Sequence, residues 1–273
     1  MRDHTEEQVR LLISHVDDLC RRADNGAISN TSFLTMREQI EIDRHLGSAG
    51  REATVYWGGY AGSERKMLFC LPEYIYASLE LPARELGAAE LRPWLGEIWQ
   101  ECMTVLRVKG SGYRELDHRD YLGSLLSLGI ERAVIGDIVV QSASQALVVC
   151  ERKIGDYLLS VWKTVGADSV KVSAVELPED FFVERKFEDI RDTIASERLD
   201  CVLAALTNLS REKAQSMIRA GLVDVDFITE QRTDRSVPDG AILSVRGYGR
   251  YEIVGTDGMT RKGRLRLIAK KFI

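Results

Sequence analysis

The sequence has few cysteines and histidines, and their spacing excludes several kinds of site. The five cysteines are scattered and include no CxxC pair, and the four histidines are equally dispersed. This pattern is unlike a zinc site or a disulfide framework and is typical of reduced cysteines in a protein core. We therefore expect no bound metal. The cysteines are Cys20, Cys70, Cys102, Cys150 and Cys201.

Long apolar runs are also absent. No stretch reaches the roughly 18 apolar residues that would predict a membrane span. The acidic N-terminal segment MRDHTEEQVRLLISHVDDLC lacks the apolar centre of a signal peptide, so we expect a cytoplasmic protein. A chain of 273 residues with 45% hydrophobic and 29% charged residues is typical of a folded protein with two or three domains.

The net charge of −5 hides a difference between two parts of the chain. Residues 194–273 contain 14 Lys and Arg against 10 Asp and Glu, whereas the preceding residues contain 23 against 32. A basic C-terminal part on an acidic body suggests a polyanionic partner for that part. A solvated basic surface without a partner would have the same composition.

Regular spacing of apolar residues predicts an N-terminal domain with helices and strands. Apolar residues three and four apart predict a helix over 9–20, and a second helix is expected over 36–45, ending at Gly47. The runs TVYWGGY and KMLFCLP are typical of strands, joined by the turn AGSER. Pro82 and Pro93 mark the expected boundary with the next domain.

The middle segment alternates between strand and helix patterns in the order β-α-β-β-α-β. That order is the split pattern of ferredoxin-like folds, which RNA-binding modules, enzymes and regulators share. The aromatic RNP1 string of a typical RRM is absent, so the topology alone assigns no function. The expected strands cover 103–109, 135–140, 145–150 and 169–175, and the expected helices cover 118–129 and 154–165.

Several short strings suggest an enzyme but are more simply structural. HRD at 118–120 lacks the asparagine and the other motifs of a kinase. GGYAGSERK and RGYGR complete neither a phosphate loop nor a dinucleotide motif. RLD at 198–200 also surrounds the catalytic aspartate of one class of pseudouridine synthases, yet the residues that follow differ here. An aspartate that opens an apolar helix is favoured by the helix dipole. We predict no catalytic residue and no cofactor.

The segment NLSREKAQSMIRAGLVDVD, residues 208–226, predicts a capped amphipathic helix followed by a strand. Ser210 is a good N-cap and Gly221 a good residue after the helix end. Arg211, Gln215 and Arg219 share one face of this helix. Guanidinium groups near a helix N-terminus favour phosphate, although a plain solvated face has the same pattern.

The surrounding sequence resembles the small RNA-binding domain first defined in ribosomal small-subunit protein four, here called the S-four domain. The resemblance implies that this part of the chain binds RNA. One departure is Asp226-Phe227, which stands where the family usually has Asn-Gly. The matching residues are Arg198, Leu199, Asp200, Leu203, Ser210, Arg211, Ala214, Ile218, Gly221, Val223, Val225, Pro238, Asp239, Gly240 and Ile242.

Nearly the whole chain resembles the YlmH family, through FLTMREQIEI, YWGGYAGSERKMLFCLP, LDHRDYLGSLLSLGIERAVIGDIVV, RGYGRYEI and TRKGRLRL. The resemblance implies a multidomain α+β protein with an RRM-like middle domain. It also implies a non-enzymatic, ribosome-associated RNA-binding protein that acts in the rescue of stalled translation. The predicted parts are an N-terminal α/β domain (1–82), a ferredoxin-like, RRM-like βαββαβ domain (83–178), a linker (179–195) and an S-four RNA-binding domain (196–273).

Basic residues of the C-terminal part are the predicted RNA contacts. Arg264, Arg266 and Lys270 alternate with apolar residues, which predicts a strand with one basic face. Such side chains contact phosphates, while the shape of the RNA supplies specificity. The predicted RNA-binding residues are Arg198, Ser210, Arg211, Lys213, Gln215, Arg219, Arg246, Arg250, Arg261, Lys262, Arg264 and Arg266.

Three functions are consistent with these patterns. The leading one is a monomer that binds structured RNA, ribosomal RNA with or without tRNA, on the large ribosomal subunit, without cofactor, metal or membrane. The second is an RNA-modifying enzyme targeted by its S-four domain, which would need catalytic groups in residues 1–190. The third is a cell-division-linked regulator whose acidic N-terminal domain binds protein.

Overall fold

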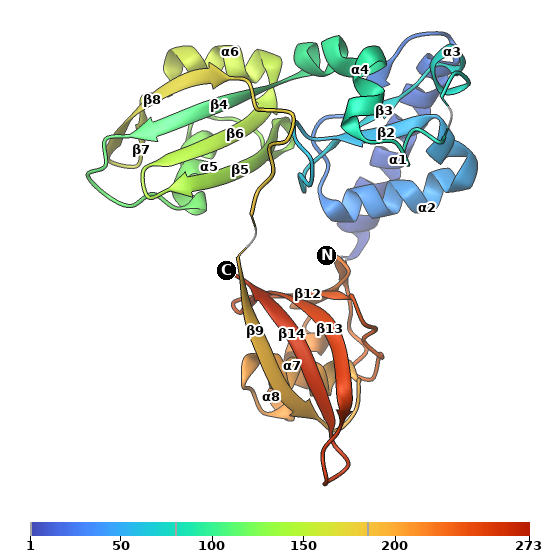
Figure 1. The fold of residues 1–273 in the computed structure, drawn as a ribbon, viewed down its shortest axis with the longest axis vertical. Helices are drawn as coiled ribbons and strands as arrows, with labels where there is room; N and C mark the ends of the chain where they lie inside the picture. The colour runs from blue at the N-terminus through green and yellow to red at the C-terminus, as the bar shows by residue number, and fades with distance from the viewer. Residues whose placement is uncertain (1, 80, 185) are drawn as a thin grey trace. The chain divides into compact units, whose positions relative to one another are not determined.

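The protein folds into two compact units, Met1–Val183 and Glu184–Ile273 (Figure 1). The structure is a computed structural model that describes residues 2–79, 81–184 and 186–273. Both units combine helices with antiparallel sheets, so the predicted mixture of α and β structure in a multidomain chain is confirmed. The domain boundary predicted after residue 82 lies inside the first unit.

The N-terminal part of the first unit combines two long helices with a three-stranded sheet in the order β1-β3-β2. Its elements are α1 (Arg2–Asp24), β1 (Ser29–Asn30), α2 (Met36–Glu52), β2 (Thr54–Trp57) and β3 (Met67–Cys70). The helix predicted over 9–20 is confirmed within α1. A capping box between Thr35 and Glu38 starts α2. The predicted helix end at Gly47 is wrong: Gly47, with φ of 62°, makes a kink, after which the helix resumes.

Two cysteines that are distant in the sequence meet in the core of this part. The Sγ atoms of Cys20 on α1 and Cys70 on β3 lie 3.4 Å apart, and both thiols are free. The hydrogen bond between them lowers the pKa of Cys20 and raises that of Cys70, which burial raises further. Cys70 belongs to the core beside Val16 and Ile42, and the partly buried Cys20 packs against it; their separation of fifty residues hid this contact from sequence spacing.

A helix that the sequence pattern did not predict, α4 (Ala88–Cys102), joins the N-terminal part to the next sheet. Pro93, which the sequence pattern placed at a domain boundary, lies inside this helix. Leu91, Leu95 and Trp99 lie four residues apart and are buried. Burial of this stripe stabilises the helix despite the hydrogen bond that proline cannot make. A one-turn helix, α3 (Glu73–Tyr76), precedes it.

The predicted β-α-β-β-α-β order is present in the rest of the first unit. The elements are β4 (Met103–Gly110), α5 (His118–Ser127), a 3₁₀ turn (Arg132–Val134), β5 (Ile135–Ser142), β6 (Gln145–Glu151), α6 (Arg152–Val161), β7 (Thr164–Val165) and β8 (Asp168–Val175). The strand order is β5-β6-β4-β8-β7, and every neighbouring pair is antiparallel. The helix predicted to reach residue 165 ends at Val161, because Trp162 leaves the helix in an extended conformation.

Both faces of this five-stranded sheet are covered over part of their area. One face packs against α5 and α6, where Leu106 and Val148 meet Leu125 and Leu158. The other face shares a core with the N-terminal part, through residues that include Val105, Leu147, Val149, Phe33 and Tyr60. This shared core explains why residues 1–183 form one compact unit.

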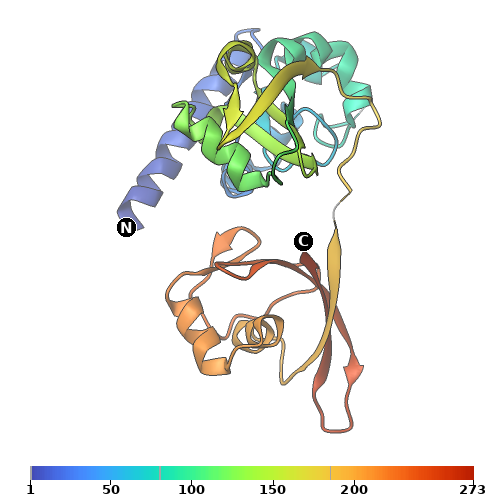
Figure 2. The ribbon, with the colours of Figure 1, turned by 90° about the vertical axis from the view of Figure 1, so that its left-hand side faces the viewer.

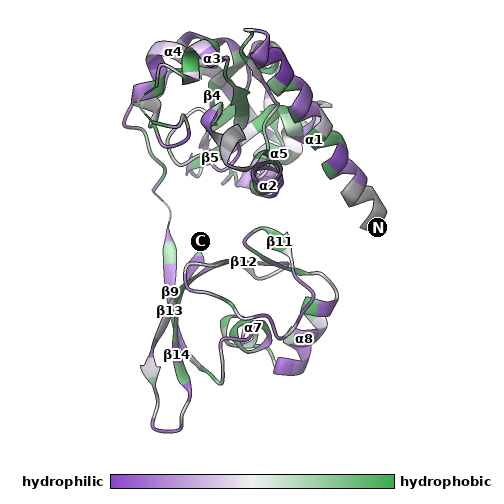
Figure 3. Ribbon diagram, turned by 90° about the vertical axis from the view of Figure 1, so that its right-hand side faces the viewer, coloured by the Kyte–Doolittle hydropathy of each residue, from purple (hydrophilic) through white to green (hydrophobic). Residues whose placement is uncertain are grey.

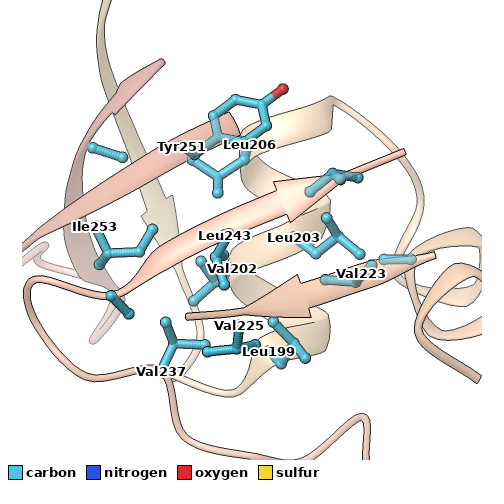
Figure 4. Packing of buried hydrophobic residues seen from close by; sticks show 14 of the residues in the cluster. Leu199, Val202, Leu203, Leu206, Val223, Val225, Val237, Leu243, Tyr251 and Ile253 are labelled. Carbon is cyan, nitrogen blue, oxygen red and sulfur yellow. The ribbon is translucent and has the colours of Figure 1, made fainter. Parts of the chain in front are cut away.

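The second unit is a curved six-stranded sheet with two helices on one side (Figure 2). Its elements are β9 (Phe187–Ile194), α7 (Leu199–Thr207), α8 (Arg211–Arg219), β10 (Val223–Val225), β11 (Ile228–Thr229), β12 (Ile242–Val245), β13 (Gly249–Met259) and β14 (Leu265–Phe272). The strand order is β11-β10-β12-β13-β14-β9. Figure 4 shows Leu199, Val202, Leu203 and Leu206 of α7 facing Val223, Val225 and Leu243 of the strands.

Strand β9 corrects the prediction of a linker over 179–195. It pairs antiparallel with β14 along its whole length, from Ile194 opposite Leu265 to Phe187 opposite Phe272. The segment is rich in charge, which suggested a linker, but Ile190 and Ile194 contact the core of the second unit. Alternation of two apolar residues with exposed charges is sufficient for an edge strand of a half-covered sheet.

Candidate nucleic-acid interface

The helix pair α7–α8 is built as the sequence predicted. Asn208, with φ of 55°, ends α7 in the left-handed conformation. Ser210 Oγ accepts a hydrogen bond from the Lys213 amide at 3.3 Å and caps α8. Gly221, with φ of 69°, follows the end of α8. These caps fix the direction of α8 and therefore the positions of its polar side chains.

A buried carboxylate organises the basic side chains at the start of the two helices. Asp200, in the first turn of α7, has a side chain with no exposed surface. It accepts hydrogen bonds from Arg198 Nε at 3.2 Å, Arg211 Nε at 3.0 Å and Gln215 Nε2 at 2.7 Å. Burial raises the pKa of Asp200, but these three hydrogen bonds outweigh it and hold the pKa well below the ordinary value. The carboxylate is thus ionised at neutral pH, and all of these donors are bound to it.

The arginines held by Asp200 remain at the surface. The side chains of Arg198 and Arg211 are 41% and 54% exposed. A guanidinium group presents five N–H donors, and the bond to Asp200 from Arg211 uses Nε. Asp200 therefore fixes the two side chains in place while their outer edges face solvent. We call Asp200, Arg198 and Arg211 the Asp200 cluster.

The predicted stripe of Arg211, Gln215 and Arg219 is only partly correct. Gln215 turns toward Asp200 and supports the Asp200 cluster, because a buried carboxylate requires donors on its remaining lone pairs. Arg219 lies exposed in the last turn of α8. The exposed Arg246 is also near this end, since its amide donates to Leu222 O at 3.0 Å.

A second group of arginines, which the sequence analysis missed, is held in the same way. Glu230, nearly buried, accepts from Arg232 Nη2 at 3.1 Å and Arg235 Nη1 at 3.0 Å, and from the amides of Gln231 and Arg232. Hydrogen bonds from Arg232 outweigh burial and lower the pKa of Glu230 to about 2. The Arg232 side chain is 73% exposed. We call Glu230, Arg232 and Arg235 the Glu230 cluster.

The two clusters lie beside each other. The amide of Leu199 donates to Arg235 O at 2.8 Å, and the amide of Asp200 donates to Thr233 O at 3.0 Å. The loop that carries the Glu230 cluster therefore runs along the N-terminus of α7. Sequence spacing does not predict this contact, because about thirty residues separate the two segments. The one signal in the sequence is the pair of arginines in the string QRTDRS.

The basic hairpin between β13 and β14 is present, but it does not extend the surface of the helices as predicted. Leu267 and Ala269 face the core that the helices cover. Arg266 and Lys270 alternate with them and so lie on the opposite face of the sheet. On that face Lys270 stands between Asp189 and Glu252 of the adjacent strands. The opposite charges reduce the attraction of this face for a polyanion.

The remaining predicted residues belong to the hairpin and to the same outer face. Arg261 and Lys262 are exposed at the hairpin turn, which Figure 3 shows as hydrophilic. Arg264 is exposed and its Nη2 donates to Thr193 O. The Arg250 guanidinium lies 5.4 Å from the ring centre of Phe227. These contacts fix Arg250 and Arg264 against the sheet.

The departure Asp226-Phe227 keeps the hairpin turn expected for Asn-Gly. The two residues have φ of 50° and 65°, the conformations of a type I′ turn between β10 and β11. Asp226 Oδ1 accepts from the Ile242 amide at 2.9 Å, which fixes the turn to β12. Aspartate tolerates this conformation better than most residues, whereas a phenylalanine there is strained.

The strings that suggested enzymes have local structural roles. Asp117 and Asp120 form a capping box around His118, and burial lowers the pKa of His118. In RGYGR, Gly247 has positive φ in the turn before β13, and Gly249, also with positive φ, is the first residue of that strand. Over the part of the chain that the structure describes, no group of three metal-ligating side chains occurs. Among those residues, no helix has the length and apolarity needed to cross a bilayer.

Fold and sequence together define a class and then a family. Residues 103–179, the β-α-β-β-α-β sheet, match the family model described as "Putative RNA-binding domain in YlmH", so the chain is of the class of RNA-binding-domain proteins. The chain is 30% identical over 238 residues to the protein of Bacillus subtilis (strain 168) named ribosome-associated protein quality control protein P2, covering 87% of this chain and 84% of the relative. The protein belongs to the YlmH family.

One solved structure is also similar. The structure titled cell division protein ylmH from Streptococcus pneumoniae aligns with 64% of this chain and 92% of its own. The TM-score is 0.43 and the sequence identity is 16%.

Proposed function

We propose that the protein is a ribosome-associated, non-enzymatic RNA-binding protein of the cytoplasm. It docks through its second unit on structured RNA of the large ribosomal subunit, with tRNA as an additional contact, and it acts in the rescue of stalled translation. Membership of the YlmH family and the name of the B. subtilis relative support this function. The resemblance of residues 196–273 to the S-four domain supports the choice of the docking unit.

The observation that carries the proposal is the Asp200 cluster. A flexible surface arginine loses side-chain entropy when it binds a phosphate. Arg198 and Arg211 are already held by a buried carboxylate while about half of each side chain is exposed. Binding therefore costs these two arginines less side-chain entropy than it costs a flexible arginine. The exposed edge of each guanidinium group can reach a phosphate oxygen.

The adjacent Glu230 cluster widens this surface. Arg232 and Arg235 add two cations beside the N-terminus of α7, where the positive end of the helix dipole also favours anions. Four arginines held by two carboxylates are suited to contact the phosphates of a folded RNA and are less suited to read a base sequence. Recognition would thus depend on RNA shape, as expected for ribosomal RNA.

The test is sedimentation of the full-length protein with ribosomal subunits. We expect Arg198→Gln/Arg211→Gln to reduce association with large subunits by about tenfold at physiological salt, because two phosphate contacts are lost. Glutamine keeps an N–H donor for Asp200, which limits structural damage. The matched control is Arg21→Gln/Arg44→Gln, two exposed arginines of α1 and α2, with the same change of charge. Equal association of the two double variants would refute the assignment.

A further inference from the structure

The string GGYAGSERK, residues 58–66, forms a rigid loop against the middle sheet. The carboxylate of Asp137 on β5 accepts from Tyr60 Oη at 2.7 Å and from the amides of Glu64 and Arg65 at 2.8 and 2.9 Å. A side chain at Gly58 has no room, since a Cβ there would lie 2.2 Å from Arg65 O. The loop is therefore held in one conformation by contacts that the proposed ribosome docking does not use.

A cavity of about 350 Å³ lies beside this loop. Aromatic walls come from Tyr56, Trp57 and Trp99, with Trp57 and Trp99 stacked at 4.7 Å between ring centres and 21° between planes. The same two tryptophans also line a neighbouring cavity of about 380 Å³. Cavities of this size that combine aromatic and aliphatic walls with a few polar groups are typical of small-molecule sites.

Two buried polar atoms at the cavity have no hydrogen-bond partner among the described residues. They are Ser63 Oγ, in the loop, and Trp99 Nε1, on α4. The two residues are only 3% and 5% exposed, and both line the cavity. A buried donor without a partner costs about 1–3 kcal/mol, so proteins rarely contain one without a reason. Both atoms can donate to an acceptor on a ligand.

We propose that this cavity binds a single nucleotide, either free or as an unpaired residue of RNA. A nucleobase is planar and can stack on the aromatic walls, and its carbonyl oxygens and ring nitrogens accept hydrogen bonds from Ser63 and Trp99. Lys66 and Arg84 also line the cavity and favour a phosphate group; Arg84 pairs with Asp43, which lines the cavity as well, so Lys66 is the main candidate for this contact. The volume suits one nucleotide and not a longer segment.

The site is independent of the proposed docking surface. All of its residues belong to the first unit, whereas the Asp200 and Glu230 clusters belong to the second. All of the lining also precedes residue 103, outside the segment that matches the RNA-binding family model.

The experiment follows the indole N–H signals of the four tryptophans in ¹H–¹⁵N spectra of the full-length protein. The probes are AMP, GMP, CMP and UMP, and then a single-stranded hexaribonucleotide. We expect the Trp99 signal to shift on addition of at least one mononucleotide or of the oligonucleotide. Ser63→Ala and Trp99→Phe should each weaken binding roughly three- to tenfold, the effect of one hydrogen bond. Ser63→Ala removes a single oxygen and keeps the test valid if Trp99→Phe fails to fold.

The matched control is Trp94→Phe, a 43% exposed tryptophan of the same helix that lines neither cavity. It should bind like the wild type, as should Arg198→Gln/Arg211→Gln, so the result is separable from ribosome docking. Oligonucleotide binding at least tenfold tighter than any mononucleotide would identify RNA as the source, and equal binding would identify the free nucleotide. Absence of a shift with every probe, or unchanged binding by Ser63→Ala, would overturn the proposal.

Discussion

Arginine has opposite roles in the two units. In the first unit, Arg65 donates to the carbonyl oxygens of Ile135, Phe33 and Arg132 at 2.8–3.0 Å, and burial lowers its pKa. Arg132 is similarly enclosed, and burial lowers its pKa to about 10. In the second unit, hydrogen bonds to carboxylates raise the pKa of Arg211 and Arg232, whose heads face solvent.

The difference shows that the role of an arginine depends on which group is buried, the arginine itself or the carboxylate that it contacts. Where the arginine is enclosed, its donors are used by backbone carbonyls, and these hydrogen bonds stabilise the fold. Where the carboxylate is enclosed, as with Asp200 and Glu230, the arginine is held but remains open to a polyanion. The same residue type thus fixes the interior of one unit and forms the proposed binding surface of the other.

The largest expected effect is on the stability of the first unit. Asp137→Ala leaves Tyr60 Oη and the amides of Glu64 and Arg65 without their acceptor. We expect a loss of about 3 kcal/mol in the free energy of unfolding. Urea unfolding followed by tryptophan fluorescence reports on this unit alone, because all four tryptophans precede residue 183. The control is the exposed Asp156→Ala on α6, and a loss similar to the control would contradict the role given to Asp137.

The second prediction concerns both stability and binding. Asp200→Asn keeps the shape of the side chain but removes the charge that holds Arg198 and Arg211. We expect about 2 kcal/mol less stability in the second unit, seen as faster amide hydrogen exchange, and roughly tenfold weaker association with large subunits. Asp257→Asn, at an exposed position of the same unit, should change neither. Normal association with faster exchange would separate the cluster from RNA binding.

The third prediction compares the two faces of the second unit. Arg198→Gln/Arg211→Gln should reduce the slope of log affinity against log salt by about 1.5–2, because two phosphates are no longer neutralised. Arg191→Gln/Arg266→Gln, on the outer face of the sheet, should leave the slope nearly unchanged. The measurement is ribosomal binding over a salt series. An equal reduction by both pairs would place RNA on the outer face as well.

The smallest expected effect is on acid stability. The pKa of Glu230 is about 2 in the folded protein, against an ordinary value of about 4.3. Its contribution to stability is therefore complete above about pH 4.3 and is lost as the pH falls toward about 2. Asp200 acts in the same direction, because its pKa is also lowered. Hydrogen exchange of the second unit from pH 5 to 2 should be less pH-dependent in Glu230→Gln; an unchanged profile would contradict the assignment.

Local patterns predicted most of the elements, and the failures have identifiable causes. The periodic segments α1, α5, α7 and α8 and the strands of the middle sheet lie where their apolar spacing indicated. Local patterns did not predict α4, because a proline such as Pro93 is typical of a break, whereas burial of Leu91, Leu95 and Trp99 stabilises the helix around it. Strand β9 was missed because its charges face solvent and its pairing partner, β14, is about seventy residues away.

The sequence alone determined the family, the β-α-β-β-α-β order of the middle segment, the helix pair α7–α8 and the basic character of the second unit, because these depend on residue types and short-range spacing. Only the tertiary structure decided which basic residues act together. It brought Arg198, Arg211 and Gln215 onto Asp200, placed the Glu230 cluster beside them, and turned Arg266 to the other face. The physical reason is that a buried carboxylate collects its donors by distance in space, which the linear spacing of charges does not reveal.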